Sequence, residues 1–409
     1  MISFKATLSL SLAIVVGVLF VIFLAVLPLQ YKLPKPEPVR IPTRLPNGTV
    51  IRFDTMLPQL IHQMWKTGSS PPQETVRWRD GCIAVNRDYE FRMYDDDQLL
   101  EFTTKQYPEY LPLFKSLHGV YMADMARILI VYHYGGIYMD LDFYCRRPFH
   151  CLDSQLSRLI GLQAPGYKDV LAVSLEPKVH ANIFRNKDRV VIQDFFMATP
   201  KHPFFKWFLD NRKSAFEKDP SHPTKGPFSY SIEKEIDEYK VFKAEERRLK
   251  RASMVAALEA TNMKSGNLKA RTGGNGTLPF RGRGRGRGRG RKNASGDLLA
   301  GDAAEEYLDA SEGVIVELRE DILHALVDSS NSRLGKTCSQ SPPPAIAKDS
   351  CSFVNKGQYF RPSDSTVAVH MWTHTYLGWN LLRGAYNAQL YNSVEKELPP
   401  TMACGAPFV

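Results

Sequence analysis

The sequence predicts an α/β protein in which strands and helices alternate around a mostly parallel sheet. Short apolar runs of strand length occur at LIHQMW (residues 60–65) and IYMDLDFYC (137–145). Between them, GVYMADMARILIVYHYGG (119–136) carries apolar residues at helical spacing and stops at a glycine pair. Strands that alternate with helices at this rhythm are typical of Rossmann-like half-units.

The other elements follow in order from Leu57. QETVRWRDGCIAVN (73–86) predicts a helix, YEFRMYD (89–95) a second strand, and DDQLLEFTTKQYP a helix that the aspartates at 95–97 begin. VVIQDFFMATPKHPFF (190–205) contains an apolar strand. Periodicity returns in EGVIVELREDILHALV (312–327), and the short strand in STVAVHMWTHTYLGWN (365–380) leads into an end rich in His and Trp.

The N-terminus predicts a membrane anchor. No charged residue lies between Lys5 and Lys32, and a stretch of about 20 apolar residues spans a bilayer as a helix. We expect a cytosolic stub (1–5), a transmembrane signal anchor (6–30) and a Pro-rich stem (31–56) in a single-pass type II protein. A cleaved signal peptide is the alternative, although the apolar run is long for one and no small-x-small cleavage site follows. Four basic residues after the run also oppose this orientation.

Charge distribution separates a catalytic region from an insertion. Residues 261–295 hold ten lysines and arginines and no acidic residue. The rest of the chain therefore contains equal numbers of basic and acidic residues. We therefore expect a basic, low-complexity insertion (241–313) between two structured parts, 57–240 and 314–409. Arg-Gly repeats bind RNA in some proteins, which leaves a nucleic-acid-binding protein as an alternative.

Cysteines and glycosylation sequons favour a secretory lumen. Six cysteines suit an oxidising compartment, and we expect the local pairs Cys145–Cys151 and Cys338–Cys351. Fifteen connectivities are possible for six cysteines, and buried free thiols are the alternative. Acceptor sequons occur at Asn47, Asn275 and Asn293.

Asp140 and Asp142 form a D-x-D motif at the end of an apolar run. Alternating residues of a strand share one face, so the two carboxylates are expected side by side. Carboxylates suit Mn²⁺ or Mg²⁺, and the phosphates of a bound donor complete the coordination shell. The metal then stabilises a departing diphosphate. The alternative is two acids that cap a strand end beside solvent.

The surroundings of this motif resemble a known family. ADMARILIVYHYGGIYMDLDFYCRRPF (123–149) resembles the D-x-D sugar-binding region of glycosyltransferase family 32. Further similarity lies in LIHQMWKTGSSPP, NRDYEFRMYDDD, GPFSYS (226–231) and VAVHMW. The resemblance covers residues 57–240 and 314–385 and implies a GT-A fold and a retaining reaction.

The resemblance also implies roles in donor binding. Asp124 and Arg127 lie at i and i+3 on one helical face, where the first is expected to bind sugar hydroxyls and the second the sugar or phosphate. An intrahelical ion pair is the alternative. Trp65 is expected against the nucleotide base, although a Trp at a strand end usually packs in the core. Tyr138, Gly135 and Gly136 complete the donor-binding set. The two glycines are expected to allow close approach of the backbone to the donor, although a glycine that ends the helix explains Gly135 equally well.

Two late residues complete the predicted site. The resemblance implies that His370 is a third metal ligand, with His374 in reserve and a satisfied core histidine as the alternative. Asp194 is predicted as the catalytic polar group nearest the reaction. His62 is interpreted as structural.

Together these features predict a Golgi membrane glycosyltransferase, with the endoplasmic reticulum as the alternative location. The expected donor is GDP-mannose, with UDP-galactose or UDP-N-acetylglucosamine as alternatives, and the expected acceptor is a glycan or a glycolipid. Outside the enzyme class, an inactive glycan-binding relative would have a broken metal site, whereas both aspartates of the motif are present.

Overall fold

A computed structural model describes residues 57–163, 169–220, 231–271, 313–328, 332–372 and 392–404. The predicted stub, anchor and stem lie outside these ranges, as do the three sequons, His374 and residues 226–230. Within the described ranges, no helix combines the length and the apolar composition needed to cross a membrane.

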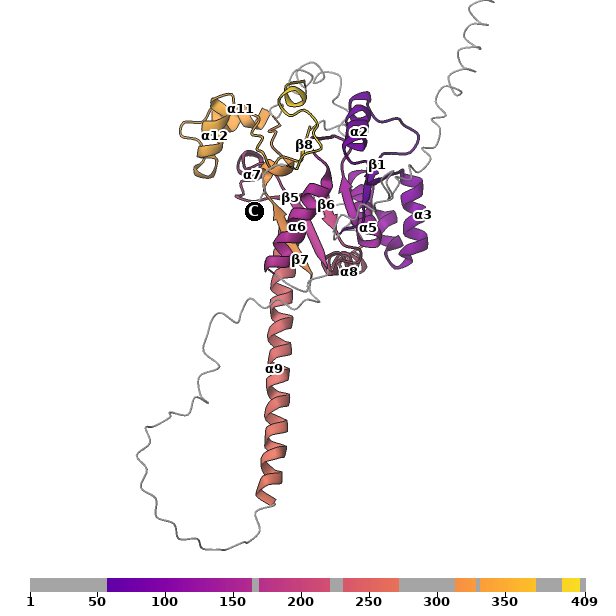
Figure 1. Cartoon of the computed structure of the whole chain (residues 1–409), viewed down its shortest axis with the longest axis vertical. Coiled ribbons are helices and arrows are strands. Elements are labelled where there is room, and N and C mark those ends of the chain that lie inside the picture. The colour runs from indigo at the N-terminus through magenta and orange to yellow at the C-terminus, as the bar shows by residue number, and fades with distance from the viewer. Residues whose placement is uncertain are drawn as a thin grey trace, which may run out of the picture. The chain divides into compact units, whose positions relative to one another are not determined.

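A six-stranded sheet forms the centre of the fold (Figure 1). Its strands, in spatial order, are β2 (Glu90–Tyr94), β1 (Leu60–Met64), β3 (Gly136–Met139), β6 (Val191–Ala198), β5 (Val170–Leu175) and β7 (Val314–Leu318). The pairs β1–β2, β1–β3 and β5–β7 are parallel, whereas β6 runs antiparallel to both of its neighbours. The expected mixed, mostly parallel sheet of a GT-A-like fold is therefore confirmed.

Strand β6 lies at the centre of the core. All eight of its residues are buried, as expected for a nearly continuous apolar strand that is covered on both faces. Gln193 and Asp194 interrupt this apolar run. A carboxylate in such a position is stable only if other groups hydrogen-bond to it, so the sequence of β6 already requires polar partners for Asp194.

Helices cover both faces of the sheet. On one face, α5 (Val120–Tyr134) and α8 (Pro203–Lys218) share an apolar cluster with α3 (Asp96–Gln106). On the other face, a second cluster joins α2 (Gln73–Val85), α6 (Phe149–Gln163) and α10 (Glu320–Leu323). Asp95 forms a capping box with Gln98 at the start of α3, which confirms the helix start expected there.

The other helices of the described ranges are two short 3-10 helices and five α-helices. They are η1 (Pro108–Tyr110), α4 (Leu111–Ser116), α7 (Lys178–Arg185), α9 (Glu233–Arg271), α11 (Ser332–Cys338), η4 (Ala345–Ala347) and α12 (Lys348–Asn355). The predicted start of the insertion, residue 241, falls inside α9, which Figure 1 shows as one long helix.

A second sheet brings the C-terminal region to the D-x-D motif. Strand β4 (Phe143–Cys145) pairs antiparallel with β8 (Ala368–His370), and Phe143 lies opposite His370. The single strand expected over residues 137–145 is therefore wrong. The chain leaves the main sheet after Met139, turns at Leu141 and Asp142, and enters this second sheet.

Three disulfides are present, two of which join segments far apart in the sequence, and no cysteine in the described ranges is free. Cys338–Cys351 is confirmed, whereas the expected Cys145–Cys151 pair is wrong. Cys145 bonds to Cys82 and Cys151 to Cys404. The physical reason is that Cys145 ends a strand packed on α2, whereas Cys151 lies in α6.

Candidate active site

The D-x-D motif lies at the turn between the two sheets, with Asp140 just before the turn and Asp142 within it. The backbone N–H of Asp140 donates to the carbonyl oxygen of Asp194 at 2.9 Å, so the neighbouring strand β6 fixes the start of the turn. Asp142 is buried, but the Asp140 side chain keeps 31% of its surface exposed. The carboxylates therefore converge through a turn, and one of them stays open to a ligand.

His370 joins the two aspartates. Its Nε2 atom lies 3.0 Å from Oδ1 of Asp142, and its ring stacks on Phe143 with centroids 4.8 Å apart. One ligand atom from each of Asp140, Asp142 and His370 lies within 4.8 Å of the others. Two carboxylates and an imidazole are a donor set that Mn²⁺ accepts, so these residues fit the predicted metal site.

Asp140 also belongs to a charged cluster from α5 and β3. Nη1 of Arg127 lies 3.7 Å from Asp140, and Nη2 lies 3.2 Å from Asp124. The Tyr138 hydroxyl donates to Asp140, and the Arg127 guanidinium lies 4.8 Å from the Tyr138 ring centroid. The predicted residues Asp124, Arg127 and Tyr138 are therefore adjacent to the motif.

Opposing effects set the protonation of these acids. Burial raises the pKa of Asp140, the Arg127 guanidinium lowers it, and the Asp142 and Asp194 carboxylates raise it further. Burial also raises the pKa of Asp124, to about 7, against the effect of Arg127. The carboxylates of this cluster repel one another more than Arg127 alone offsets. A divalent cation between them would stabilise their charged forms.

Asp194 lies on β6 and contacts a network of buried polar groups. Its Oδ1 atom accepts from Ser174 Oγ at 2.9 Å, and its Oδ2 atom lies 2.6 Å from Nε2 of His324. Nδ1 of His370 lies 3.0 Å from the same Oδ2 atom. Burial opposes the charge of Asp194, but His324 and His370 hold its pKa below the usual range. Burial likewise opposes the charge of His370, but Asp142 and Asp194 raise its pKa well above the ordinary value.

Two members of this network were not predicted from sequence. His324 follows α10 in an otherwise apolar run, and Ser174 lies on β5. A histidine within an apolar run was the one available signal for His324. Nothing in the sequence connects it with Asp194, which lies 130 residues away.

The other predicted donor-binding residues lie near the ends of β1 and β3. Trp65 is half-buried just after β1, where its indole N–H donates to Ser69 at 3.0 Å. Gly135 and Gly136 have φ angles of +67° and +85°. A Cβ atom on Gly136 would lie 2.6 Å from the Leu60 carbonyl oxygen, so the absence of a side chain allows close packing with β1.

His62 has the structural position that was expected. Its Nδ1 atom lies 3.1 Å from the Tyr94 hydroxyl and its Nε2 atom 3.0 Å from the Gly135 carbonyl oxygen. Burial lowers the pKa of His62 to about 4. The neutral imidazole thus connects β1 to β2 and to the end of α5.

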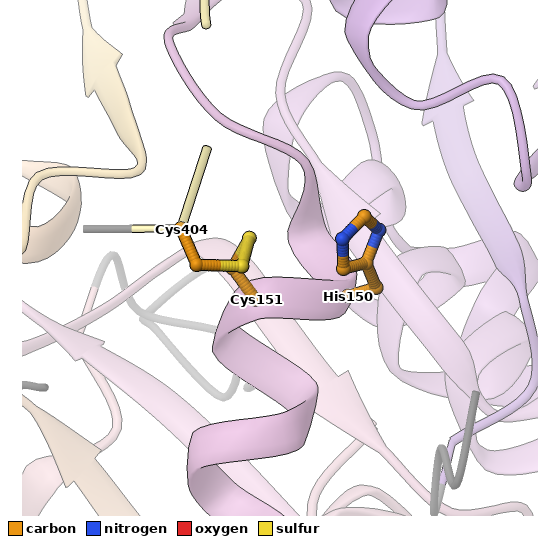
Figure 2. A group of neighbouring side chains, drawn as sticks. All are labelled: His150, Cys151 and Cys404. Carbon is orange, nitrogen blue, oxygen red and sulfur yellow. A yellow bond between two sulfur atoms is a disulfide. The ribbon is translucent and has the colours of Figure 1, made fainter. Parts of the chain in front are cut away.

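A further group of potential metal ligands is excluded by covalent bonding. His150, Cys151 and Cys404 lie close together, as Figure 2 shows. Their two sulfur atoms form a disulfide, so neither is available as a thiolate ligand. His150 itself lies 3.2 Å from Asp88.

Comparison with known proteins assigns a class to the region that carries the motif. Residues 72–159 match a family described as "Glycosyltransferase sugar-binding region containing DXD motif". The expected resemblance to family 32 is therefore confirmed for this region of the chain.

Curated relatives include several fungal mannosyltransferases. Inositol phosphoceramide mannosyltransferase 1 of Schizosaccharomyces pombe is 30% identical over 38% of this chain and 42% of its own length. Mannosyl phosphorylinositol ceramide synthase CSH1 of Saccharomyces cerevisiae is 32% identical over 39% and 37%. The initiation-specific alpha-1,6-mannosyltransferase of the same yeast is 28% identical over 27% and 25%. The chain spans less than half the length of each of these relatives.

Proposed function

We propose that this chain is a metal-dependent glycosyltransferase that moves mannose from GDP-mannose to a glycolipid or glycan acceptor. The observation that carries the proposal is the convergence of Asp140, Asp142 and His370 beside the end of a central strand. The match of residues 72–159 to a D-x-D sugar-binding region supports the reaction class. The names of the fungal relatives support mannose as the sugar.

The residues of the site have different proposed roles in binding the metal and the donor. Asp140, Asp142 and His370 would hold the divalent cation, Mn²⁺ or Mg²⁺, which supplies positive charge to the departing diphosphate. Arg127 holds Asp140 and Asp124 in place through ion pairs. Asp124 is buried in the same cluster, where its Oδ1 atom pairs with Arg127, and we propose that its other oxygen, Oδ2, binds donor hydroxyls.

The rest of the proposed donor site lies at the ends of β1 and β3. The half-exposed indole of Trp65 is available to stack on the nucleotide base. We propose indirect roles for the two glycines. Gly135 lets the end of α5 lie close to Pro200, just after β6, and Gly136 lets β3 pack closely against Leu60 of β1, which sets the position of Tyr138 and Asp140.

We also propose that the described part of the chain folds in the lumen of the secretory pathway, most simply at the Golgi membrane. All six cysteines are paired in three disulfides, which form and persist in oxidising compartments. Endoglycosidase sensitivity of the expressed protein tests this location through the predicted sequons.

A donor panel with the purified protein tests the reaction. GDP-mannose, UDP-galactose and UDP-N-acetylglucosamine are each incubated with Mn²⁺, with Mg²⁺ or with EDTA, and nucleoside diphosphate release and product mass are measured. We expect release from GDP-mannose with metal and none with EDTA. Release only from a UDP-sugar would replace the proposed donor, and equal release with EDTA would contradict the metal role.

Asp142→Asn and Asp97→Asn form a matched pair for this assay. Asp97 is exposed in the first turn of α3, away from the D-x-D turn. We expect Asp142→Asn to lose metal-dependent release and Asp97→Asn to keep it. Equal activity of the two variants would remove the assignment of the site.

A further inference from the structure

We infer that Asp194 is a positioning residue that orients His370 as a metal ligand, and that His324 and Ser174 hold Asp194 in turn. This inference rests on the proposed function, because it assumes a cation between Asp140, Asp142 and His370. The inference assigns a role to residues that contact a metal ligand and do not bind the metal themselves. This role differs from the predicted one, in which Asp194 takes part directly in the reaction.

The first argument is that Asp194 has no open side toward a substrate. Its side chain is 5% exposed, and both carboxylate oxygens have close polar partners. Oδ1 accepts from Ser174, whereas Oδ2 lies 2.6 Å from Nε2 of His324 and 3.0 Å from Nδ1 of His370. A group that attacks or stabilises the anomeric carbon needs a free oxygen that faces the sugar.

The second argument concerns the two nitrogens of His370. Because Nδ1 lies against Asp194, Nε2 is directed at Asp142 and the D-x-D turn. Stacking on Phe143 further limits rotation of the ring. A carboxylate on the far nitrogen of a metal-ligating histidine fixes its tautomer and orientation and strengthens it as a ligand.

The third argument is that Asp194, His324 and His370 do not form a second metal site. One ligand atom from each of Asp194, His324 and His370 also lies within 4.8 Å of the others. Their side chains are 5%, 0% and 8% exposed, so there is no access for the water or phosphate ligands that Mg²⁺-like ions usually keep. The Asp140 side chain, at 31%, provides that access on the other side of His370.

Manganese binding by the full chain tests the inference without requiring transfer activity. The electron paramagnetic resonance signal of free Mn²⁺ is followed during titration, without nucleotide and with excess GDP or UDP. We expect one Mn²⁺ per wild-type chain and an affinity about 10–100-fold weaker in Asp194→Asn. Ser174→Ala should weaken binding in the same direction.

Two substitutions of His324 separate positioning from simple packing. His324→Gln keeps an N–H donor that can reach Asp194, whereas His324→Leu removes it. We expect Gln to retain Mn²⁺ affinity within about threefold, and Leu to lose about 10–100-fold. His202→Gln serves as the matched control, because His202 is also fully buried but lies at the start of α8. It should lower thermal stability without changing Mn²⁺ affinity.

Several results would overturn the inference. Wild-type Mn²⁺ affinity in Asp194→Asn together with a lost kcat would identify Asp194 as a catalytic group. Two Mn²⁺ per chain, one of which persists in Asp140→Asn, would identify the buried group as a second metal site. Equal affinities for His324→Leu and His324→Gln would remove the role of His324.

Failure of the proposed function gives a different pattern. In that case the wild-type chain binds no Mn²⁺ under any of the three nucleotide conditions, or His370→Ala binds it as tightly as the wild type. Either result removes the metal site itself and with it the inference about Asp194.

Discussion

Nε2 of His370 lies 3.0 Å from Oδ1 of Asp142, although 228 residues separate them in the sequence. The pairing of β4 with β8 creates this contact, because it places His370 opposite Phe143, the residue after Asp142. The antiparallel pair therefore brings the second half of the chain to the D-x-D turn. The catalytic region needs both of its parts for the site to form.

Gly136→Ala should destabilise the fold. The φ angle of +85° is unfavourable for a residue with a side chain, and the added Cβ would lie 2.6 Å from the Leu60 carbonyl oxygen. We expect a loss of about 2–5 kcal/mol in the free energy of unfolding, measured by denaturant titration. Gly81→Ala is the matched control, since its Cβ meets nothing within 4 Å in helix α2. It should gain about 0.5–1 kcal/mol. Equal stability of the two variants would contradict the packing role of Gly136.

Arg127→Met should be strongly destabilising. The guanidinium is buried beside Asp124 and Asp140, and its removal leaves the buried Asp124 and the partly buried Asp140 without their cationic partner. We expect a loss of about 3–5 kcal/mol in the free energy of unfolding. Arg248→Met removes an exposed partner of Glu245 on α9 and should leave the denaturant midpoint of unfolding nearly unchanged, because solvent screens an exposed ion pair. A small effect at Arg127 would mean that its ion pairs do not support the site.

His62 should make the protein less stable in mild acid. Burial lowers its pKa from 6.5 to about 4, so between these pH values the unfolded chain binds a proton that the folded chain does not. The contribution of neutral His62 to the free energy of unfolding is therefore fully present above pH 6.5. It is lost as the pH decreases to 4, which lowers the free energy of unfolding by about 3 kcal/mol.

The variant His62→Gln should flatten this part of the stability–pH curve. The same substitution at exposed His118 controls for the loss of a histidine. Urea unfolding midpoints between pH 4 and pH 8 provide the measurement. An unchanged slope in His62→Gln would show that another group causes the acid sensitivity.

Sequence patterns predicted most of the sheet and most of the groups around the D-x-D motif. Asp124, Arg127, Tyr138 and Asp140 come from two adjacent elements, so their proximity follows from local periodicity. The family resemblance alone indicated that His370 belongs with the motif, because its contact with Asp142 depends on pairing between distant strands. His324 was missed for the same physical reason, since its pairing with Asp194 arises only in the folded chain.

The incorrect predictions have a common origin. The run IYMDLDFYC has the composition of one strand, but its two ends pair with different sheets. The same division places Cys145 against α2, out of reach of Cys151. Local composition indicates strand residues, whereas the choice of partner depends on segments far along the chain.

The disulfides should differ in their contributions to stability. In the chain-entropy model, a cross-link stabilises more when it closes a longer loop. Cys151–Cys404 spans 253 residues and Cys338–Cys351 spans 13. The double serine variant of the first pair should lose more than that of the second, with about 3 kcal/mol expected for the short loop.

Thermal unfolding of the two double variants, with peptide mapping under non-reducing conditions, checks this order. A peptide that links Cys145 to Cys151 would contradict the pairing described here. A larger loss for the short loop would contradict the entropic account.

The central claim is that Asp140, Asp142 and His370 bind a divalent cation that carries the diphosphate of the donor. A crystal structure of the protein with Mn²⁺ and GDP tests it most directly through the anomalous signal of manganese. We predict one strong peak bonded to these three side chains and to the GDP phosphates. A peak elsewhere, with the three side chains unchanged and free of metal, would contradict the claim.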